Sequence, residues 1–222
     1  MTANLEAYAE LKAQLPAGTT LVAVSKFQPN EAIESLYAAG HRDFGENRVQ
    51  ELAAKAAVLP KDIRWHMIGR IQTNKIREFA LFVHLVHSVD RVDVLTVLQK
   101  EALRAGRTID ILLQVHIAQE ETKAGFSPAE VLGLCAVNVL NEYPNLRVVG
   151  LMGMASLTED RNQIRSEFAR LASLYRAAQE QLGVGQITVL SMGMSGDYDL
   201  ALAEGGNHIR VGSLLFGARS NQ

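Results

Sequence analysis

The sequence predicts a single (β/α)8 TIM barrel of the α/β class, with one extra helix at its N-terminus. Eight short runs of β-branched and apolar residues alternate with longer amphipathic runs along the 222 residues. Strands that helices separate pair in parallel, because each helix forms a right-handed crossover. The runs are largely apolar, as in a sheet covered on both faces, and such a barrel takes ~200–250 residues. An open doubly wound sheet is the alternative, since eight strands do not by themselves require closure.

The first half of the chain is predicted to contain four strand–helix units, preceded by a helix at 5–15. The first strand, LVAVS at 21–25, is apolar enough to be buried. Asn30 is expected to cap the helix that follows, and Gly40 to end it. The other elements predicted in this half are strands at 41–44, 65–68 and 83–87, and helices at 30–39, 46–58, 73–79 and 92–105, with Thr73 and Asp90 as N-caps.

The second half is predicted to contain the other four units. The strand IDILLQV at 109–115 precedes a helix that Ser127 caps and Pro128 opens, running to about residue 141. A long amphipathic helix at 163–182 ends at Gly183. The remaining predicted elements are strands at 147–152, 187–192 and 208–211, and helices at 198–203 and from Ser213 onward. Because no linker, repeat or low-complexity segment interrupts the pattern, we expect one domain over 1–222.

The composition argues against several classes of protein. With 48% hydrophobic and 21% charged residues, the chain has the balance of a globular domain. The 22 Lys and Arg against 24 Asp and Glu, without a basic stripe, argue against a nucleic-acid partner. The single cysteine, Cys135, cannot form an internal disulfide and is expected to be a buried core thiol. The sequence shows no signal peptide and no membrane-spanning run, so we expect a cytoplasmic protein.

Lys26 follows the first predicted strand directly, at the end of the barrel where active sites of this fold lie. Low-dielectric walls disfavour the charged form of a lysine, so its amine becomes nucleophilic and attacks aldehydes. The alternative is a lysine whose side chain merely extends from the strand end into solvent. Lys26 is therefore a candidate for a covalent bond to an aldehyde ligand.

Glycine and serine gather after the seventh and eighth predicted strands, where barrels of this kind often bind phosphate. Tight turns that need glycine for a positive φ are the alternative explanation. Together with Lys26, these loops favour a ligand with an aldehyde and a phosphate, namely pyridoxal phosphate. Arg210 lies on the same strand end and would keep the pyridine nitrogen unprotonated, which weakens the ring as an electron sink. The residues in question are Ser191, Gly193, Gly196, Gly212 and Ser213.

Eight ordered segments along nearly the whole chain resemble the pyridoxal phosphate homeostasis protein family. Several long motifs in the same order are far more specific than a single glycine motif. The segments are VAVSK (22–26), FGENRVQE (44–51), WHMIGRIQTNK (65–75), HSVDR (87–91), EETKAGF (120–126), GLMGM (150–154), LSMGMSGDYDLA (190–201) and IRVGSLLFGAR (209–219).

The resemblance implies a barrel like the N-terminal domain of alanine racemase, without that enzyme's second domain. It implies intracellular binding and delivery of pyridoxal 5'-phosphate and effects on amino-acid and keto-acid balance, with no established catalytic turnover. Pyridoxal-phosphate-dependent apoenzymes are the implied partners, and we expect a monomer. The implied cofactor contacts are a Schiff base (internal aldimine) on Lys26, phosphate contacts from Ser191, Gly212 and Ser213, Arg210 at the pyridine nitrogen, Asn47 nearby, and His66 and Met67 lining the pocket.

Two other functions remain open at this point. A small amino-acid racemase would need acid–base groups on both faces of the cofactor. Lys26 could serve one face, but the tyrosine of alanine racemase that serves the other comes from its second domain. The third possibility is a barrel that binds another phosphorylated metabolite, with Lys26 as a charge partner only.

Some residues depart from the family pattern or have no assigned role. His116 stands where the family usually has asparagine, and we expect it to pack locally. Ser213 stands where threonine is frequent, and it keeps the hydroxyl. Lys123 belongs to a charged loop, with Glu120 and Glu121, which is either solvated or part of a rim that holds cofactor during transfer. No group of histidines has metal-ligand spacing in the sequence, so we expect no metal.

Overall fold

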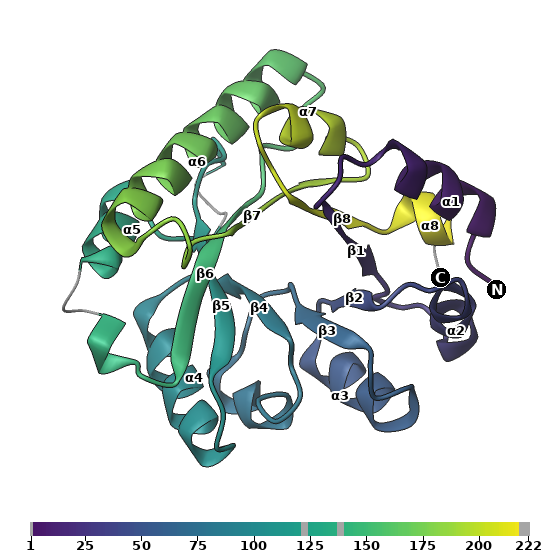
Figure 1. The fold of residues 1–222 in the computed structure, drawn as a ribbon, viewed down its shortest axis with the longest axis horizontal. Coiled ribbons are helices and arrows are strands. Elements are labelled where there is room, and N and C mark those ends of the chain that lie inside the picture. Colours follow the sequence, from purple (N-terminus) through teal and green to yellow (C-terminus); the bar gives the residue numbers. More distant parts are fainter. Residues whose placement is uncertain (1, 121–123, 137–139, 218–222) are drawn as a thin grey trace.

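The eight strands form a closed parallel barrel in the order of the sequence, with helices around it (Figure 1). The computed structural model describes residues 2–120, 124–136 and 140–217. The first and last strands close the barrel, with Thr20 paired to His208 and Ala23 to Val211. The (β/α)8 barrel is therefore confirmed, and the open sheet is excluded. The strands are β1 (Thr20–Val24), β2 (Asp43–Glu46), β3 (Arg64–Met67), β4 (Leu85–Val89), β5 (Ile109–Val115), β6 (Leu146–Gly153), β7 (Val189–Met194) and β8 (His208–Val211).

The helices cover the outside of the barrel, and the extra N-terminal helix packs beside the last one. The backbone N–H of Asn4 donates to the carbonyl of Leu215 at 2.8 Å, which ties the start of the chain to the end of the barrel. The helices are α1 (Leu5–Gln14), α2 (Asn30–Ala38), α3 (Val49–Val58), α4 (Val92–Arg104), α5 (Pro128–Cys135), α6 (Arg161–Leu182), α7 (Tyr198–Ala203) and α8 (Ser213–Phe216), with the 3₁₀ helices η1 (Thr73–Glu78) and η2 (Leu140–Glu142).

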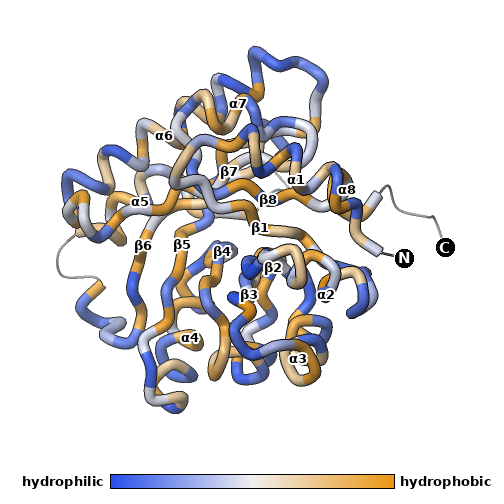
Figure 2. Tube along the Cα trace, turned by 45° about the vertical axis from the view of Figure 1, so that its right-hand side comes forward, coloured by the Kyte–Doolittle hydropathy of each residue, from blue (hydrophilic) through white to orange (hydrophobic). Residues whose placement is uncertain are grey.

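The core has two layers because side chains of a strand alternate between its faces. The larger layer lies between the strands and the helices and contains Trp65 and Met67. The smaller layer fills part of the barrel interior. Figure 2 shows hydrophobic residues along the strands of the barrel. The interior layer consists of Leu85, Leu112, Val149, Met152 and Val189.

Three strands begin two residues later than the sequence pattern predicts: β2, β4 and β7. The reason is that buried residues precede each of them. His41, Val83 and Ile187 are buried in the connections, so burial starts before the strand does. A hydrophobic pattern indicates burial rather than strand pairing. The pattern therefore predicted the starts of these three strands two residues too early.

Helix caps were predicted with mixed success. Ser127 is confirmed, since its hydroxyl accepts from the Glu130 N–H while the Glu130 carboxylate accepts from the Ser127 N–H. Asn30, Thr73 and Asp90 are wrong as N-caps, because these positions belong to Pro29, Gln72 and Arg91. The Asp90 carboxylate instead accepts from the Arg91 guanidinium at 2.7 Å.

Helices α3 and α5 are shorter than predicted. Helix α3 begins at Val49 because β2 runs to Glu46, and α5 ends at Cys135 rather than near residue 141. Part of that predicted extension, 137–139, lies outside the described residues. Cys135 is buried in the core, as expected, and burial raises the pKa of its thiol to about 11.

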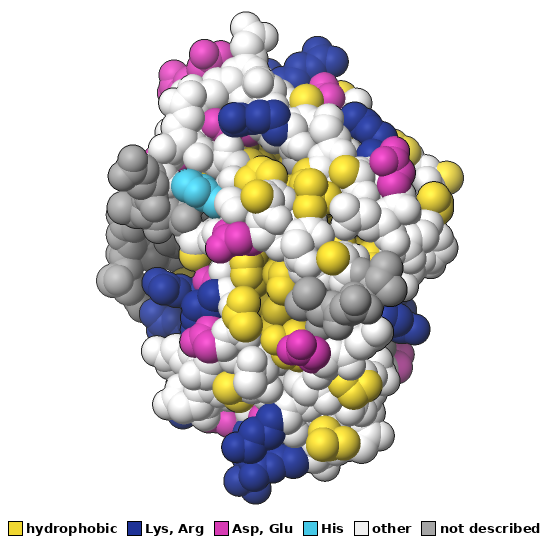
Figure 3. All heavy atoms as spheres, turned by 90° about the vertical axis from the view of Figure 1, so that its left-hand side faces the viewer, with side chains coloured by type: hydrophobic (Ala, Val, Ile, Leu, Met, Phe, Trp, Pro, Cys, Tyr) yellow, Lys and Arg dark blue, Asp and Glu magenta, His cyan; other side chains and the backbone are white. Residues whose placement is uncertain are grey.

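The surface agrees with the charge pattern of the sequence. On the face viewed in Figure 3, described side chains of both charge signs are interspersed around a central group of hydrophobic ones. The described basic side chains form no continuous stripe on that face. Among the described helices, none is both long and apolar enough to cross a membrane.

Candidate functional site

Lys26 lies in the turn that follows β1, half-buried at the C-terminal end of the barrel. The residues on either side of it are held in place. The Ser25 hydroxyl donates to Glu46 Oε1 at 2.6 Å, and the Phe27 N–H donates to Glu51 Oε2 at 2.8 Å. Phe27 has a φ of 63°, alone among the described non-glycine residues in the left-handed region. Such backbone persists only where its surroundings enforce it, so the turn presents Lys26 in a defined position.

A buried ion pair between Lys55 and Glu46 supports this turn. Lys55 Nζ donates to Glu46 Oε1 and to the Ser25 carbonyl, both at 2.8 Å, and lies 3.5 Å from Glu51 Oε2. Glu46 is fully buried, and its Oε2 has no hydrogen-bond partner among the described residues. Burial raises the pKa of Glu46, and the charge of Lys55 opposes that shift. The motif FGENRVQE thus supplies both carboxylates that fix the Lys26 turn.

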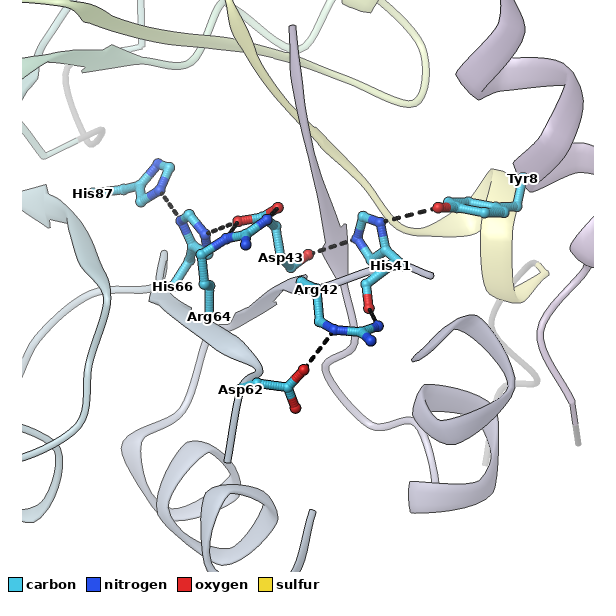
Figure 4. A network of polar contacts seen from close by, with 8 residues as sticks. All are labelled: Tyr8, His41, Arg42, Asp43, Asp62, Arg64, His66 and His87. Atoms are coloured by element: carbon cyan, nitrogen blue, oxygen red, sulfur yellow. Dashed lines mark hydrogen bonds and ion pairs between the residues drawn. The ribbon is translucent and has the colours of Figure 1, made fainter. Parts of the chain in front are cut away.

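A chain of polar side chains crosses the interior of the barrel (Figure 4). It starts at Arg64, whose Nε donates to Asp43 Oδ1 at 2.7 Å and whose second nitrogen bonds the other oxygen. His66 Nε2 lies 3.1 Å from the same Oδ1, and His66 Nδ1 lies 2.9 Å from His87 Nε2. These four side chains come from β2, β3 and β4.

The same chain continues to Arg210 on β8. His87 Nδ1 lies 2.9 Å from Ser191 Oγ, to which Arg210 donates at 2.6 Å. A second Arg210 nitrogen donates to the Gly153 carbonyl at 3.0 Å. Burial lowers the pKa of Arg210 to about 10, and the charge of Asp197 opposes that shift, so Arg210 stays charged at neutral pH.

A second polar group lies at the mouth, where β7 and β8 end. The Gly212 N–H donates to Ser195 Oγ at 3.3 Å, and Ser213 follows as the first residue of α8. Gly193 has a φ of 88°, and a Cβ there would lie 2.6 Å from the Ala201 Cβ. Glycine at 193 therefore lets α7 pack closely against the end of β7. The Ser195 hydroxyl and the Gly212 N–H therefore meet at the end of β7 and β8, where α8 begins.

Two predicted placements are wrong. Ser191 does not lie in the loop after β7, because that strand runs to Met194, and Ser191 is fully buried inside the barrel. Ser195, four residues later, is the serine whose hydroxyl lies beside the Gly212 N–H. Met67 does not line the mouth, since it is fully buried in the layer between strands and helices.

The other predicted residues occupy the barrel end or its interior. Asn47 follows β2 at the C-terminal end of the barrel and is half-buried. Its backbone lies so close to Gly69 that a Cβ at position 69 would be 2.1 Å from the Asn47 carbonyl oxygen. His66 is 1% exposed, and lies in the interior chain rather than at the surface of the mouth. His116 is held locally, with Nε2 3.0 Å from the Glu120 carbonyl, as expected of a packing residue. Glu121 and Lys123 lie outside the described residues.

The sequence did not predict one group of side chains that could ligate a metal, because its members come from separate segments of the chain. Ligand atoms of Asp43, His66 and His84 lie within 4.8 Å of one another. However, Arg64 binds both oxygens of the Asp43 carboxylate, and both ring nitrogens of His66 are in hydrogen bonds. The ligand atoms of Asp43 and His66 are thus already used within the protein, and we assign no metal to the group.

Two hollows are bounded by described residues near the barrel ends. One, of about 430 Å³, lies after β3 and β4 and is lined by Arg91 and the segment 70–74. The other, of about 300 Å³, is lined in part by His84, Asp110 and His208. Neither is lined by Lys26, Ser195 or Arg210. The candidate site is therefore defined by the positions of these residues, at or just after the neighbouring strands β1, β7 and β8.

The carboxylate of Asp43 gives the protein an acid-sensitive element. Burial raises its pKa, but hydrogen bonds from Arg64 and His66 outweigh this, so the pKa lies well below its ordinary value. A lowered pKa stabilises the fold above the unfolded-state value of about 3.9, and that contribution is lost as pH falls further. We expect Asp43→Asn to lose less unfolding free energy than the wild type between about pH 6 and about pH 3. Urea unfolding at several pH values measures this, and identical pH dependence of the two proteins would refute it.

The family model and the sequence relatives that match this chain agree on one family. The family model described as the alanine racemase N-terminal domain matches residues 2–220. Proteins named pyridoxal phosphate homeostasis protein from Pseudomonas aeruginosa and Synechocystis are each 38% identical to this chain. The alignments cover 99% of this chain and 93% of the Pseudomonas protein, and 96% and 97% for the Synechocystis pair.

Solved structures agree with these relatives. PipY from Synechococcus elongatus, solved without pyridoxal phosphate, superposes with a TM-score of 0.90 at 40% identity, covering 96% of this chain and 99% of that one. The same protein with pyridoxal phosphate bound gives 0.86 at 39% identity. An alanine racemase from Clostridium difficile, at 14% identity and 0.77, shares the fold over 98% of this chain and 56% of its own. The chain therefore belongs to the pyridoxal phosphate homeostasis protein family, with the barrel of the alanine racemase N-terminal domain.

Proposed function

We propose that the protein binds pyridoxal 5'-phosphate at the C-terminal end of its barrel and serves in the intracellular homeostasis of that cofactor. The observation that carries the proposal is that three residues with donor groups lie at or just after the neighbouring strands β7, β8 and β1. Lys26 follows β1, Arg210 lies on β8 and Ser195 follows β7. The relative PipY, whose structure was solved with pyridoxal phosphate bound, supports the same ligand here.

The residues present fit the chemistry of this cofactor. An amine suits its aldehyde, a charged guanidinium suits its ring nitrogen, and hydroxyl and backbone N–H donors suit its phosphate. Lys26 Nζ would join the aldehyde carbon as a Schiff base with loss of one water. The cofactor, when bound, would supply an electron sink for amino-group chemistry.

Arg210 would face the ring nitrogen. Its guanidinium keeps its protons at neutral pH, so it can donate to the nitrogen lone pair without transferring a proton. A ring left unprotonated is a weak electron sink, which suits holding and releasing the cofactor better than turning over amino acids. We therefore propose a binding protein rather than an enzyme.

The phosphate would be held by Ser195, Gly212 and Ser213. Ser195 replaces Ser191 in this role because its hydroxyl lies at the mouth beside the Gly212 N–H, whereas Ser191 is buried against Arg210. Asn47 would stand near the cofactor from the end of β2. Pyridoxal-phosphate-dependent apoenzymes would be the recipients, in the cytoplasm, from a monomeric carrier.

Serine-to-alanine variants distinguish the two candidate phosphate ligands. Ser195→Ala is expected to weaken cofactor binding by about 1.5–3 kcal/mol, the contribution of a hydrogen bond to a charged group. Inorganic phosphate should compete less well with the cofactor for this variant, because the lost contact is to phosphate. Equilibrium dialysis measures both quantities. Unchanged affinity of Ser195→Ala would refute the assignment of Ser195.

The function itself is tested by binding and turnover together. The purified protein is titrated with pyridoxal phosphate, and the loaded protein is then incubated with a panel of L-amino acids while racemisation and deamination are followed. We expect stoichiometric binding and no repeated turnover. Steady racemisation would replace the proposal with the racemase alternative. Binding of other phosphorylated metabolites but not of pyridoxal phosphate would favour the third function.

A further inference from the structure

Exposed apolar side chains follow four consecutive strands at the end of the barrel where the candidate site lies. Strands β6, β7, β8 and β1 are neighbours in the closed sheet, so the segments after them lie in the same order around the mouth. Exposed apolar residues scattered singly need no explanation, but an ordered group of them indicates a contact surface. The group consists of Leu157 after β6, Met194 at the end of β7, Leu214 at the start of α8 and Phe27 after β1.

Three of these four residues are sequence neighbours of a residue that would hold the cofactor. The pairs are Lys26 with Phe27, Met194 with Ser195, and Ser213 with Leu214. A partner that contacts these apolar side chains therefore lies over the place where the cofactor enters and leaves.

The exposure of Phe27 has no explanation within the chain. Its φ of 63° is a conformation that a bulky side chain rarely adopts, and its surface is 57% exposed, so burial compensates little of the strain. The Arg48 guanidinium lies over the ring, 5.1 Å from its centroid. Aromatic side chains and arginines are enriched among the residues that dominate protein–protein binding. The turn after β1 thus presents such a pair at the mouth.

Two arginines continue the order of strand ends. Arg48 follows β2 and Arg70 follows β3, the next two strands after β1. Both are exposed, and neither forms an ion pair with a carboxylate of the described residues. Arg91, after β4, is different, because it pairs with Asp90 and Asp93. Arg48 and Arg70 are therefore available to carboxylates of another molecule.

We propose that this mouth rim is the docking surface for the apo forms of the enzymes that receive the cofactor. The proposal rests on the proposed function and deepens it by naming the surface that the recipient contacts. An aldehyde released into solution reacts with any accessible amine, and release within a complex avoids that loss. The rim comprises Leu157, Met194, Leu214, Phe27, Arg48 and Arg70.

The charges of the rim determine how the recipient is oriented. The two arginines lie at one end, after β2 and β3, whereas the exposed Glu159 follows Leu157 at the other end. The complementary surface has an apolar centre, with carboxylates on the side that faces β2 and β3.

Docking is measured without cofactor on either protein. The cofactor-free protein is immobilised, and apo forms of an aspartate aminotransferase, a serine hydroxymethyltransferase and an alanine racemase are titrated by biolayer interferometry. We expect binding that weakens as salt rises, because salt screens the attraction between arginine and carboxylate. Leu157→Asp and Arg70→Glu should each weaken binding about tenfold.

Two control variants make the same changes away from the rim. Leu103→Asp and Arg176→Glu alter exposed residues of α4 and α6, nearer the C-terminal ends of these helices. Because each helix runs back from the mouth, those ends lie toward the opposite end of the barrel. Both controls should bind the apoenzymes as the wild type does.

Transfer is measured by mixing the loaded protein with an excess of apoenzyme and following the recovery of its activity. Transfer through solution cannot exceed the rate at which the cofactor dissociates, and that rate does not depend on the apoenzyme concentration. Transfer within a complex rises with that concentration. We expect the wild type to show this rise and Leu157→Asp to lose most of it, with an unchanged dissociation rate.

The outcomes separate the docking surface from the proposed function. Failure of all three apoenzymes to bind, or equal binding by rim and control variants, would overturn the docking surface. In a protein that binds pyridoxal phosphate, transfer that never exceeds the dissociation rate would also overturn it and leave the binding function intact. A wild-type protein that does not bind pyridoxal phosphate would overturn the proposed function and, with it, the role of the rim in transfer.

Discussion

Lys26→Ala is expected to lack both the visible absorption band and the trapping by borohydride that we expect of the loaded wild-type protein. An imine needs a primary amine at the aldehyde, and hydrogen bonds hold the residues on either side of Lys26 in the turn after β1. The phosphate and ring contacts do not involve Lys26, so weaker, reversible binding should persist. Absorbance before and after borohydride, combined with equilibrium dialysis, measures the two parts separately.

Lys61→Ala is the matched control for that experiment. Lys61 is an exposed lysine that donates to the carbonyls of Ala56 and Ala57 at the end of α3. Its removal should leave the band and the trapping unchanged. If Lys26→Ala keeps a reducible band of wild-type intensity, another amine forms the bond and the assignment of Lys26 is wrong.

Lys55→Met is expected to destabilise the fold by about 3–5 kcal/mol, because it leaves the carboxylate of Glu46 buried without its partner. Glu46 is fully buried, and Lys55 also holds the Ser25 carbonyl at 2.8 Å. The variant should therefore lower the urea midpoint and loosen the turn that carries Lys26. Urea unfolding gives the change in free energy, and the rate of borohydride-trappable bond formation reports the turn.

Two further variants test whether the unpaired charge of Glu46 causes the loss of stability in Lys55→Met. Lys61→Met, at the exposed lysine near the end of the same helix, should change stability by less than ~0.5 kcal/mol. Glu46→Leu combined with Lys55→Met removes both charges and should recover much of the loss, since an apolar pair of similar volume can replace a buried ion pair. A Lys55→Met protein as stable as Lys61→Met would contradict the account.

The fold was largely predictable because its signal is local. Each strand is a short apolar run and each helix has its own periodicity, so the order of eight units follows from the sequence. The residues at which the strands begin were less predictable. His41, Val83 and Ile187 are buried before their strands start, and burial alone does not distinguish a connection from a paired strand.

The site was predictable where a residue follows a strand and not where its role depends on distant partners. Lys26 and Gly212 lie where their positions after β1 and β8 placed them. Ser191 was grouped with the loop serines although it lies inside the strand and its side chain is buried in the barrel. The end of β7 was set two residues early, which hid Ser195 as the residue that follows the strand. The contact between His87 and Ser191 joins residues 104 positions apart, and no periodicity signals it. One clue was present, since outward Trp65 and Met67 imply an inward His66.

The most direct test of the central claim is the site of covalent attachment. The wild-type protein is incubated with pyridoxal phosphate, reduced with borohydride, digested, and its peptides analysed by mass spectrometry. We predict one phosphopyridoxyl group per chain, on the peptide that contains Lys26. Modification of a different lysine, or none with the cofactor in excess, would contradict the account of a Lys26 cofactor site at the barrel mouth.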